Sequence, residues 1–138
     1  MMKKYTRTSA ESYVVGDNYK RQVIVKHFKD EEGLEHEFTT FGDDYAKSVH
    51  VIAFTKDNKV VLVNQFRSGP ERWLYDFPGG LMEKREIPLE AALRELGEET
   101  GYIPGHIDNI GNFPVDGYTN FTVEVFLATD CVFVEERL

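Results

Sequence analysis

Alternating apolar and polar positions predict strands along most of the chain. Residues 19–28 carry alternating valines among neighbours of high β-propensity, which indicates a strand. Its partner is predicted at residues 37–41, after a turn at residues 30–33. Further strands are predicted at residues 49–55, 59–66, 73–77, 106–113 and 121–130, with a tight hairpin at residues 56–58 between the first two. The chain is therefore expected to contain a sheet rich in antiparallel pairs.

One helix is predicted after the strand at residues 73–77. Its apolar stripe, at positions i, i+3, i+4 and i+7, consists of Leu89, Ala92, Leu93 and Leu96. Pro88 suits the first turn of a helix, and Gly101 suits a left-handed residue that ends one. The fold class is therefore mixed α/β.

Three carboxylates share the polar side of this helix. Glu95, Glu98 and Glu99 stand at i, i+3 and i+4, so their side chains are expected to converge. Like charges at this spacing repel each other, and a bound cation would compensate them. Oxygen ligands favour Mg²⁺ or Mn²⁺ over zinc. The alternative is an ordinary solvated face on which Arg94 pairs with Glu90 and Glu98.

The spacing of glycine, arginine and glutamate residues between Gly80 and Gly101 resembles the Nudix box. The positions in register are Gly80, Glu86, Arg94, Glu95, Leu96, Glu98, Glu99 and Gly101. Only Tyr102 departs, being aromatic where an aliphatic residue is usual. The resemblance implies a Nudix-type α/β/α sandwich with a mixed sheet, in which the box forms a loop, a helix and a second loop.

Both the residue chemistry and the resemblance suggest site roles. Glu95 and Glu99, one helical turn apart, are the expected direct ligands of Mg²⁺ or Mn²⁺, with Glu98 as a third ligand or as the base. The resemblance adds the backbone carbonyl of Gly79 as a ligand. Arg94 is expected to orient neighbouring carboxylates.

Two further residues of the motif are expected to shape the loop before the helix. Glu86 is predicted to anchor this loop or to act on the metal through a water molecule. Gly80 is predicted to let the loop backbone approach the metal and the phosphate closely. Arg85 stands where many relatives have glycine, which predicts a change in loop conformation.

The segment Gln65-Phe66-Arg67 resembles a motif of the ADP-ribose and nucleoside-diphosphate-sugar pyrophosphatase branch. The guanidinium of Arg67 could donate two hydrogen bonds to a pyrophosphate, with Gln65 beside it and the Phe66 ring in the core. The alternative is a solvated Arg67 at a strand edge. The long segment before Val49 also favours this branch, whose members use an N-terminal β-region to dimerise.

The length of 138 residues predicts a single domain, with an N-terminal β-extension at residues 1–47 and a Nudix core at residues 48–138. After the last predicted strand only residues 131–138 remain, so the family's C-terminal helix is expected to be missing. Glu135 and Glu136 are candidates for a late-loop base by position alone.

Net charge and composition limit the kinds of ligand and partner that the chain is expected to bind. A net charge of −8 argues against nucleic-acid binding and leaves metal ions to bridge acidic protein and phosphate. The lack of a long apolar run or secretory signal, with one cysteine, predicts a cytoplasmic protein and no membrane span.

The predicted activity is Mg²⁺-dependent hydrolysis of a small nucleoside diphosphate linked to another moiety, ADP-ribose or a nucleotide sugar first, by a homodimer. The alternatives are a nucleoside-triphosphate or dinucleoside-polyphosphate hydrolase, and a non-catalytic nucleotide sensor.

Overall fold

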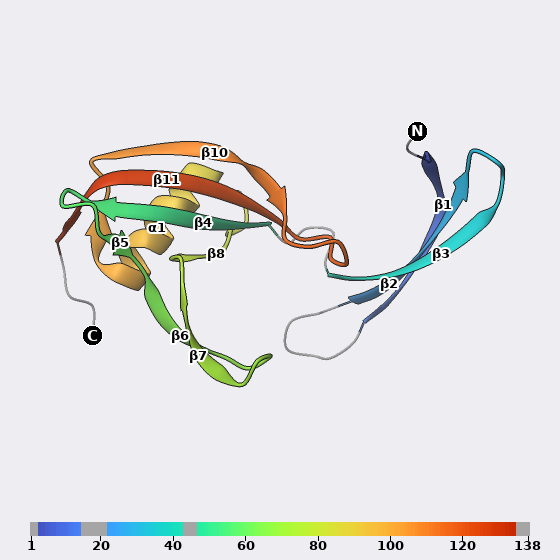
Figure 1. The fold of residues 1–138 in the computed structure, drawn as a ribbon, viewed down its shortest axis with the longest axis horizontal. Coiled ribbons are helices and arrows are strands. Elements are labelled where there is room, and N and C mark those ends of the chain that lie inside the picture. Colours follow the sequence, from blue (N-terminus) through green and yellow to red (C-terminus); the bar gives the residue numbers. More distant parts are fainter. Residues whose placement is uncertain (1–2, 15–21, 43–46, 135–138) are drawn as a thin grey trace. The chain divides into compact units, whose positions relative to one another are not determined.

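A computed structural model describes residues 3–14, 22–42 and 47–134 (Figure 1). In chain order the elements are β1 (Tyr5–Val14), β2 (Gln22–Asp30), β3 (Glu35–Gly42), β4 (Lys47–Thr55), β5 (Val60–Val61), β6 (Val63–Arg67), β7 (Arg72–Asp76), β8 (Gly79–Leu81), α1 (Pro88–Thr100), β9 (Tyr102–Ile103), β10 (His106–Pro114) and β11 (Thr122–Phe133). Within these described ranges, no helix is long and apolar enough to span a membrane. The mixed α/β class predicted from the sequence is confirmed.

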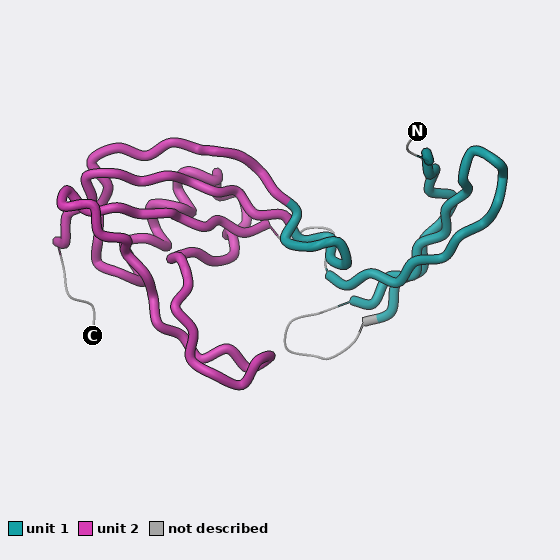
Figure 2. Tube along the Cα trace, viewed as in Figure 1, with its two compact units in different colours: residues 1–46, 114–121 teal, residues 47–113, 122–138 magenta. Residues whose placement is uncertain are grey.

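The chain divides into two compact units (Figure 2). The first contains Met1–Ala46 and Pro114–Phe121, and the second contains Lys47–Phe113 and Thr122–Leu138. The segment Pro114–Phe121, which lies between β10 and β11, therefore packs with the N-terminal strands rather than with its sequence neighbours.

The first unit is built on the three-stranded antiparallel sheet β1-β2-β3. The buried carboxylate of Asp30 organises the turn between β2 and β3, because it accepts hydrogen bonds from the backbone N–H groups of Glu32 and Leu34 at 3.0 and 2.9 Å. The 114–121 segment joins the edge of β3 through a parallel bridge between Phe41 and Thr119. Strand β1 was not predicted, since its many Ser and Thr residues give it little apolar alternation.

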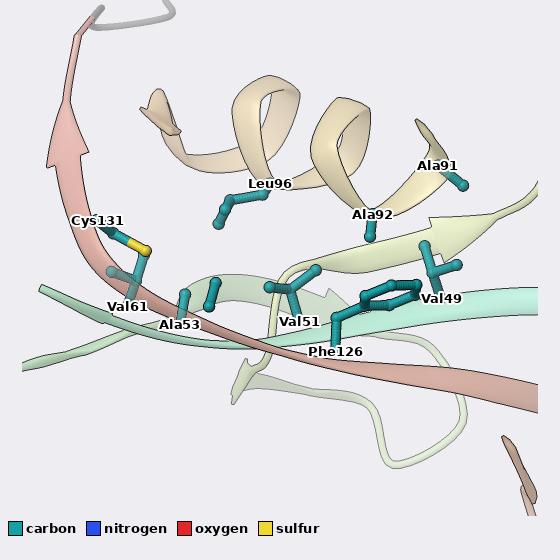
Figure 3. Packing of buried hydrophobic residues seen from close by; sticks show 10 residues of the cluster. Val49, Val51, Ala53, Val61, Ala91, Ala92, Leu96, Phe126 and Cys131 are labelled. Carbon is teal, nitrogen blue, oxygen red and sulfur yellow. The ribbon is translucent and has the colours of Figure 1, made fainter. Parts of the chain in front are cut away.

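The second unit holds the principal sheet, in the order β10-β11-β4-β5, with β8 also paired to β4 and β9 to β11. Strands β11 and β4 run parallel, from the Thr122–Lys47 pair to the Ala128–Ala53 pair before the register shifts. Helix α1 packs on one face of this sheet, and Figure 3 shows the core side chains between them. The buried cluster consists of Val49, Val51, Ala53, Val61, Ala91, Ala92, Leu96, Phe126, Ala128 and Cys131.

The buried face of α1 differs from the predicted stripe. Leu89 and Leu93 are each 40% exposed, whereas Ala91, Ala92 and Leu96 are fully buried. The small alanines let the helix approach β4 closely, so the contact surface is narrower and rotated relative to the leucine stripe. Leucine periodicity located the helix correctly but misassigned part of its core face.

The predicted strand at residues 59–66 is also divided in two. The extended conformation breaks at Leu62, so that β5 pairs with β4 while β6 turns away to pair with β7 in a separate two-stranded sheet. Continuous β-propensity cannot reveal this change of partner. The break carries Gln65 and Arg67 out of the principal sheet, and Gln65 contacts Glu99 on α1.

Candidate active site

The ends of α1 follow local rules that the sequence makes visible. Pro88 begins the helix, and the Glu90 carboxylate accepts the backbone N–H of Ile87 at 3.4 Å. Gly101 ends it in a left-handed conformation, with φ of 72° and its N–H bonded to the Gly97 carbonyl at 2.9 Å. These limits place the three carboxylates of interest in the second half of the helix.

Arg94 is the centre of the polar network on α1. Its guanidinium donates to both oxygens of Glu86, at 2.8 and 3.0 Å, and to Glu95 Oε1 at 2.7 Å. It also donates to Glu98 Oε2 at 3.3 Å and to the Leu81 carbonyl at 3.2 Å. The side chain is only 24% exposed, so the simple solvated-face alternative does not describe it.

Glu86 joins the loop before the helix to this network. Beyond its two bonds from Arg94, its Oε2 accepts the backbone N–H of Glu83 at 2.8 Å. The hydrogen bonds from Arg94 and then from the Glu83 backbone lower the pKa of Glu86. The hydrogen bonds to Glu86 and then to Glu95 raise the pKa of Arg94. The preceding Arg85 holds a φ of 74°, a conformation that favours glycine. The loop therefore keeps a glycine-like backbone despite the arginine.

Glu99 is held by two neutral donors from different strands. Gln65 Nε2 on β6 donates to its Oε1 at 2.7 Å, and the backbone N–H of Gly79 on β8 donates to its Oε2 at 2.8 Å. Gln65 and Glu99 both line a cavity of about 500 Å³ between β5, β6 and the last turn of α1. The structure thus brings Gln65 to a carboxylate of the box.

The glycines of β8 permit a close backbone approach to the helix carboxylates. A Cβ at Gly80 would lie 2.5 Å from Glu95 Oε1, and a Cβ at Gly79 would lie 2.1 Å from the Val49 carbonyl oxygen. At Gly79 the obstructing atoms belong to β4, so a side chain there would push β8 away from β4. At Gly80 the obstructing atoms are the carboxylate of Glu95, so a side chain there would displace that carboxylate.

The site can be tested for its fit to a divalent cation. Among the described residues, no three His, Cys, Asp or Glu side chains already stand together as a metal-binding group. Instead Glu95 and Glu98 turn to Arg94, while Glu99 turns to Gln65 and Gly79. The donors are nevertheless all oxygens on one side of α1, and Gly80 leaves the Glu95 carboxylate open to close approach. This donor set suits Mg²⁺ or Mn²⁺, after rotation of the carboxylates.

Arg67 does not stand free beside Gln65. Its Nε and Nη2 both lie 2.7 Å from Asp76 Oδ2 across the β6–β7 hairpin. The sequence pattern did not single out Asp76, because the contact runs diagonally across the hairpin, in which Arg67 lies opposite Arg72 and Asp76 opposite Val63. Arg67 remains 47% exposed and so keeps part of its guanidinium available to a ligand.

The aromatic residues near Arg67 on the β6–β7 hairpin are exposed. Phe66, expected in the core, is 54% exposed and meets Trp73 edge to face, with ring centroids 6.2 Å apart. Tyr75 is 73% exposed. The core position predicted for Phe66 was wrong, because β6 and β7 form their own two-stranded sheet. Glu135 and Glu136 lie outside the described residues.

The fold and site define a class of protein: a mixed α/β domain in which a glycine-rich strand leads into a helix that presents an arginine-organised carboxylate cluster. Residues 44–137 match the family described as the NUDIX domain, and the chain belongs to this Nudix family. The resemblance inferred from the box residues is therefore confirmed.

Named relatives extend this comparison. The chain is 41% identical over 91 residues to the ADP-ribose pyrophosphatase of Bacillus subtilis (strain 168), covering 65% of this chain and 49% of that protein. It is 38% identical over 82 residues to the methanol dehydrogenase activator of Bacillus methanolicus, covering 59% and 44%. It is 36% identical over 72 residues to an RNA pyrophosphohydrolase of Xylella fastidiosa (strain Temecula1 / ATCC 700964), covering 52% and 36%. The chain thus spans half or less of the length of these curated relatives.

A solved structure agrees in fold. The crystal structure of an ADP compounds hydrolase matches with a TM-score of 0.78 and 19% sequence identity, covering 100% of this chain and 74% of that one. This likeness supports the Nudix architecture inferred from the sequence.

Proposed function

We propose that this chain hydrolyses the pyrophosphate bond of a nucleoside diphosphate linked to another moiety, with ADP-ribose as the first substrate and nucleotide sugars next. Water attacks one phosphorus atom, the bridging P–O bond breaks, and the products are a nucleoside monophosphate and a sugar phosphate. The observation that carries this proposal is the Arg94 network, which gathers Glu86, Glu95 and Glu98 beside the Gly79–Leu81 strand.

The similarity to the Bacillus subtilis ADP-ribose pyrophosphatase supports this choice of substrate. The exposed face of the Arg67 guanidinium offers a fork for a phosphate oxygen, while Asp76 fixes its position. The exposed Phe66, Trp73 and Tyr75 rings on the same hairpin can stack on a planar base.

Mg²⁺ or Mn²⁺ would be held by Glu95, Glu98, Glu99 and the Gly79 carbonyl, and it would supply charge neutralisation on the phosphate oxygens. Arg94 keeps the carboxylates on one side of α1, and Glu86 keeps the loop against them. In its alternative role as the base, Glu98, with 48% of its side chain exposed, would take a proton from the attacking water.

The proposed function includes a domain organisation and an oligomeric state. Residues 1–47 act as an N-terminal β-extension and residues 48–138 as the Nudix core of one domain, and two copies assemble as a homodimer in the cytoplasm. The homodimer can be tested by measuring molar mass in solution.

A second candidate is hydrolysis of a nucleoside triphosphate or a dinucleoside polyphosphate. The similarity to RNA pyrophosphohydrolases favours including a 5′-triphosphate RNA among the substrates to be tested. The acidic charge of −8 weighs against an extended nucleic-acid contact. A third candidate is a non-catalytic nucleotide sensor, and the similarity to a methanol dehydrogenase activator supports testing for this role.

The deciding experiment incubates the purified chain with ADP-ribose, nucleotide sugars, diadenosine polyphosphates, nucleoside triphosphates and 5′-triphosphate RNA, in Mg²⁺ and in EDTA. Product separation by ion exchange should show Mg²⁺-dependent AMP and ribose 5-phosphate from ADP-ribose. Cleavage of triphosphate substrates alone would select the second candidate. No cleavage of any substrate would contradict both enzymatic proposals.

A further inference from the structure

Glu99 differs from the other box carboxylates in the charge of its partners. Glu95 and Glu98 both form ion pairs with Arg94, at 2.7 and 3.3 Å. Among the ion pairs of the described residues, none includes Glu99; its two oxygens accept from the amide of Gln65 and from the backbone of Gly79. Glu99 is therefore oriented without having its negative charge compensated.

This difference matters for a cation ligand. A charged donor such as an arginine both orients a carboxylate and competes with the cation for it, whereas an amide orients it and leaves the charge in place. Each oxygen of a carboxylate can accept more than one contact, so a hydrogen bond from Gln65 leaves room for a metal on the same oxygen.

We infer that Gln65 is a positioning residue that fixes the Glu99 carboxylate for metal binding, rather than a direct substrate contact. The inference rests on the proposed function, because it assigns Glu99 a metal. The sequence instead predicts that Gln65 lies beside Arg67 and contacts the pyrophosphate of the substrate. The two side chains leave the same strand, but Gln65 meets the helix and Arg67 meets Asp76.

The geometry supports this assignment in two ways. Gln65 is the side-chain donor to Glu99 and Gly79 is the backbone donor, so β6 and β8 hold the two carboxylate oxygens from two different strands. The contact is also partly buried and spans 34 residues of sequence, and Gln65 makes it from β6, which pairs with β7 and not with the principal sheet. The break at Leu62 thus has a consequence at the box helix.

The test is the Gln65→Met variant, which keeps the length of the side chain and removes the donor. Loss of such an outer contact should weaken Mn²⁺ binding by about 10- to 100-fold, measured by isothermal titration on the substrate-free chain. With ADP-ribose, kcat should fall by a similar factor while KM changes by less than about threefold. Asn64→Thr, a change at the neighbouring position on β6 beside the same cavity, is the matched control and should leave both quantities unchanged.

A double-mutant cycle shows whether Gln65 acts through Glu99. In a Glu99→Ala background, Gln65→Met should add no more than about a threefold loss of Mn²⁺ affinity. A full additional loss would overturn the inference, as would a Gln65→Met chain that binds Mn²⁺ normally and shows only a raised KM. Thermal unfolding of each variant identifies a folding failure, and Gln65→Leu then repeats the test.

The two proposals fail in different ways. An unsubstituted chain that binds Mn²⁺ but cleaves no substrate would contradict the proposed function, and the Mn²⁺ titrations would still decide the role of Gln65. If the unsubstituted chain is active but Gln65→Met leaves its Mn²⁺ affinity unchanged, the inference about Gln65 is overturned and the proposed function stands.

Discussion

Arg94 and Glu86 are joined by two hydrogen bonds, Nε to Oε1 at 2.8 Å and Nη2 to Oε2 at 3.0 Å, across eight residues of sequence. This fork-to-fork pair connects the middle of α1 to the loop that precedes it. Because Arg94 also contacts Glu95 and Glu98, the loop and the carboxylate face of the helix are set by one guanidinium.

Arg94→Lys should therefore disable the site without a change of charge. A lysine cannot reproduce the planar fork, so Glu86, Glu95 and Glu98 lose their common partner. We expect kcat for ADP-ribose to fall by about 10- to 100-fold, measured under saturating Mg²⁺. Arg72→Lys, an exposed position on β7, is the control and should keep full activity. Equal activity in the two variants would contradict the role given to Arg94.

Gly80→Ala should damage the same site through the backbone. The new methyl group would fall 2.5 Å from Glu95 Oε1, so the carboxylate or β8 must move. We expect Mn²⁺ affinity of the substrate-free chain to fall at least about tenfold. Gly69→Ala, where a Cβ would meet no atom within 4 Å, provides the matched change. An unaltered Mn²⁺ affinity in Gly80→Ala would show that this close approach is not needed.

Leu96→Ala should show how much the contact between α1 and the principal sheet contributes to the free energy of unfolding. Leu96 is 0% exposed at the centre of the core cluster. Truncation of a buried leucine costs about 2–5 kcal/mol of unfolding free energy. Urea denaturation should show this loss, while Leu62→Ala, at a position 44% exposed, should change stability by less than about 0.5 kcal/mol. Similar losses in both variants would place the core elsewhere.

The turn between β2 and β3 should weaken in acid. The hydrogen bond from His36, with those from Leu34 and Glu32, lowers the folded-state pKa of Asp30 below its ordinary value of 3.8. A depressed carboxyl pKa contributes stability that is present above the unfolded value and is lost as pH falls through the folded one. Amide protection factors in β2 and β3, which correct the exchange rate for its intrinsic pH dependence, should therefore fall below about pH 4.

Asp30→Asn is the comparison for this acid effect. An asparagine cannot ionise, so in this variant the protection factors of β2 and β3 should be lower at pH 6 and should vary less between pH 6 and pH 3 than those of the unsubstituted chain. If both chains show the same acid dependence, another carboxyl group controls the turn.

The extent of prediction from sequence differs between elements. Helix α1 was predicted with its correct ends, because Pro88 and Gly101 act locally on the backbone. Its core face was predicted less well, since the burial of Ala91 and the exposure of Leu93 depend on how closely β4 approaches. Strand β1 went unpredicted, because its partner β2 rather than its own pattern holds it extended.

The sequence alone determined the family and the helix carboxylates, because a fixed spacing of Glu and Arg on a 3.6-residue period places them on one side whatever surrounds the helix. Only the tertiary structure decided which donors reach them. Gln65 meets Glu99, and Arg67 meets Asp76, because β6 leaves β4 and pairs with β7. Such contacts join residues far apart in the chain, and their geometry follows from strand pairing that local patterns do not encode.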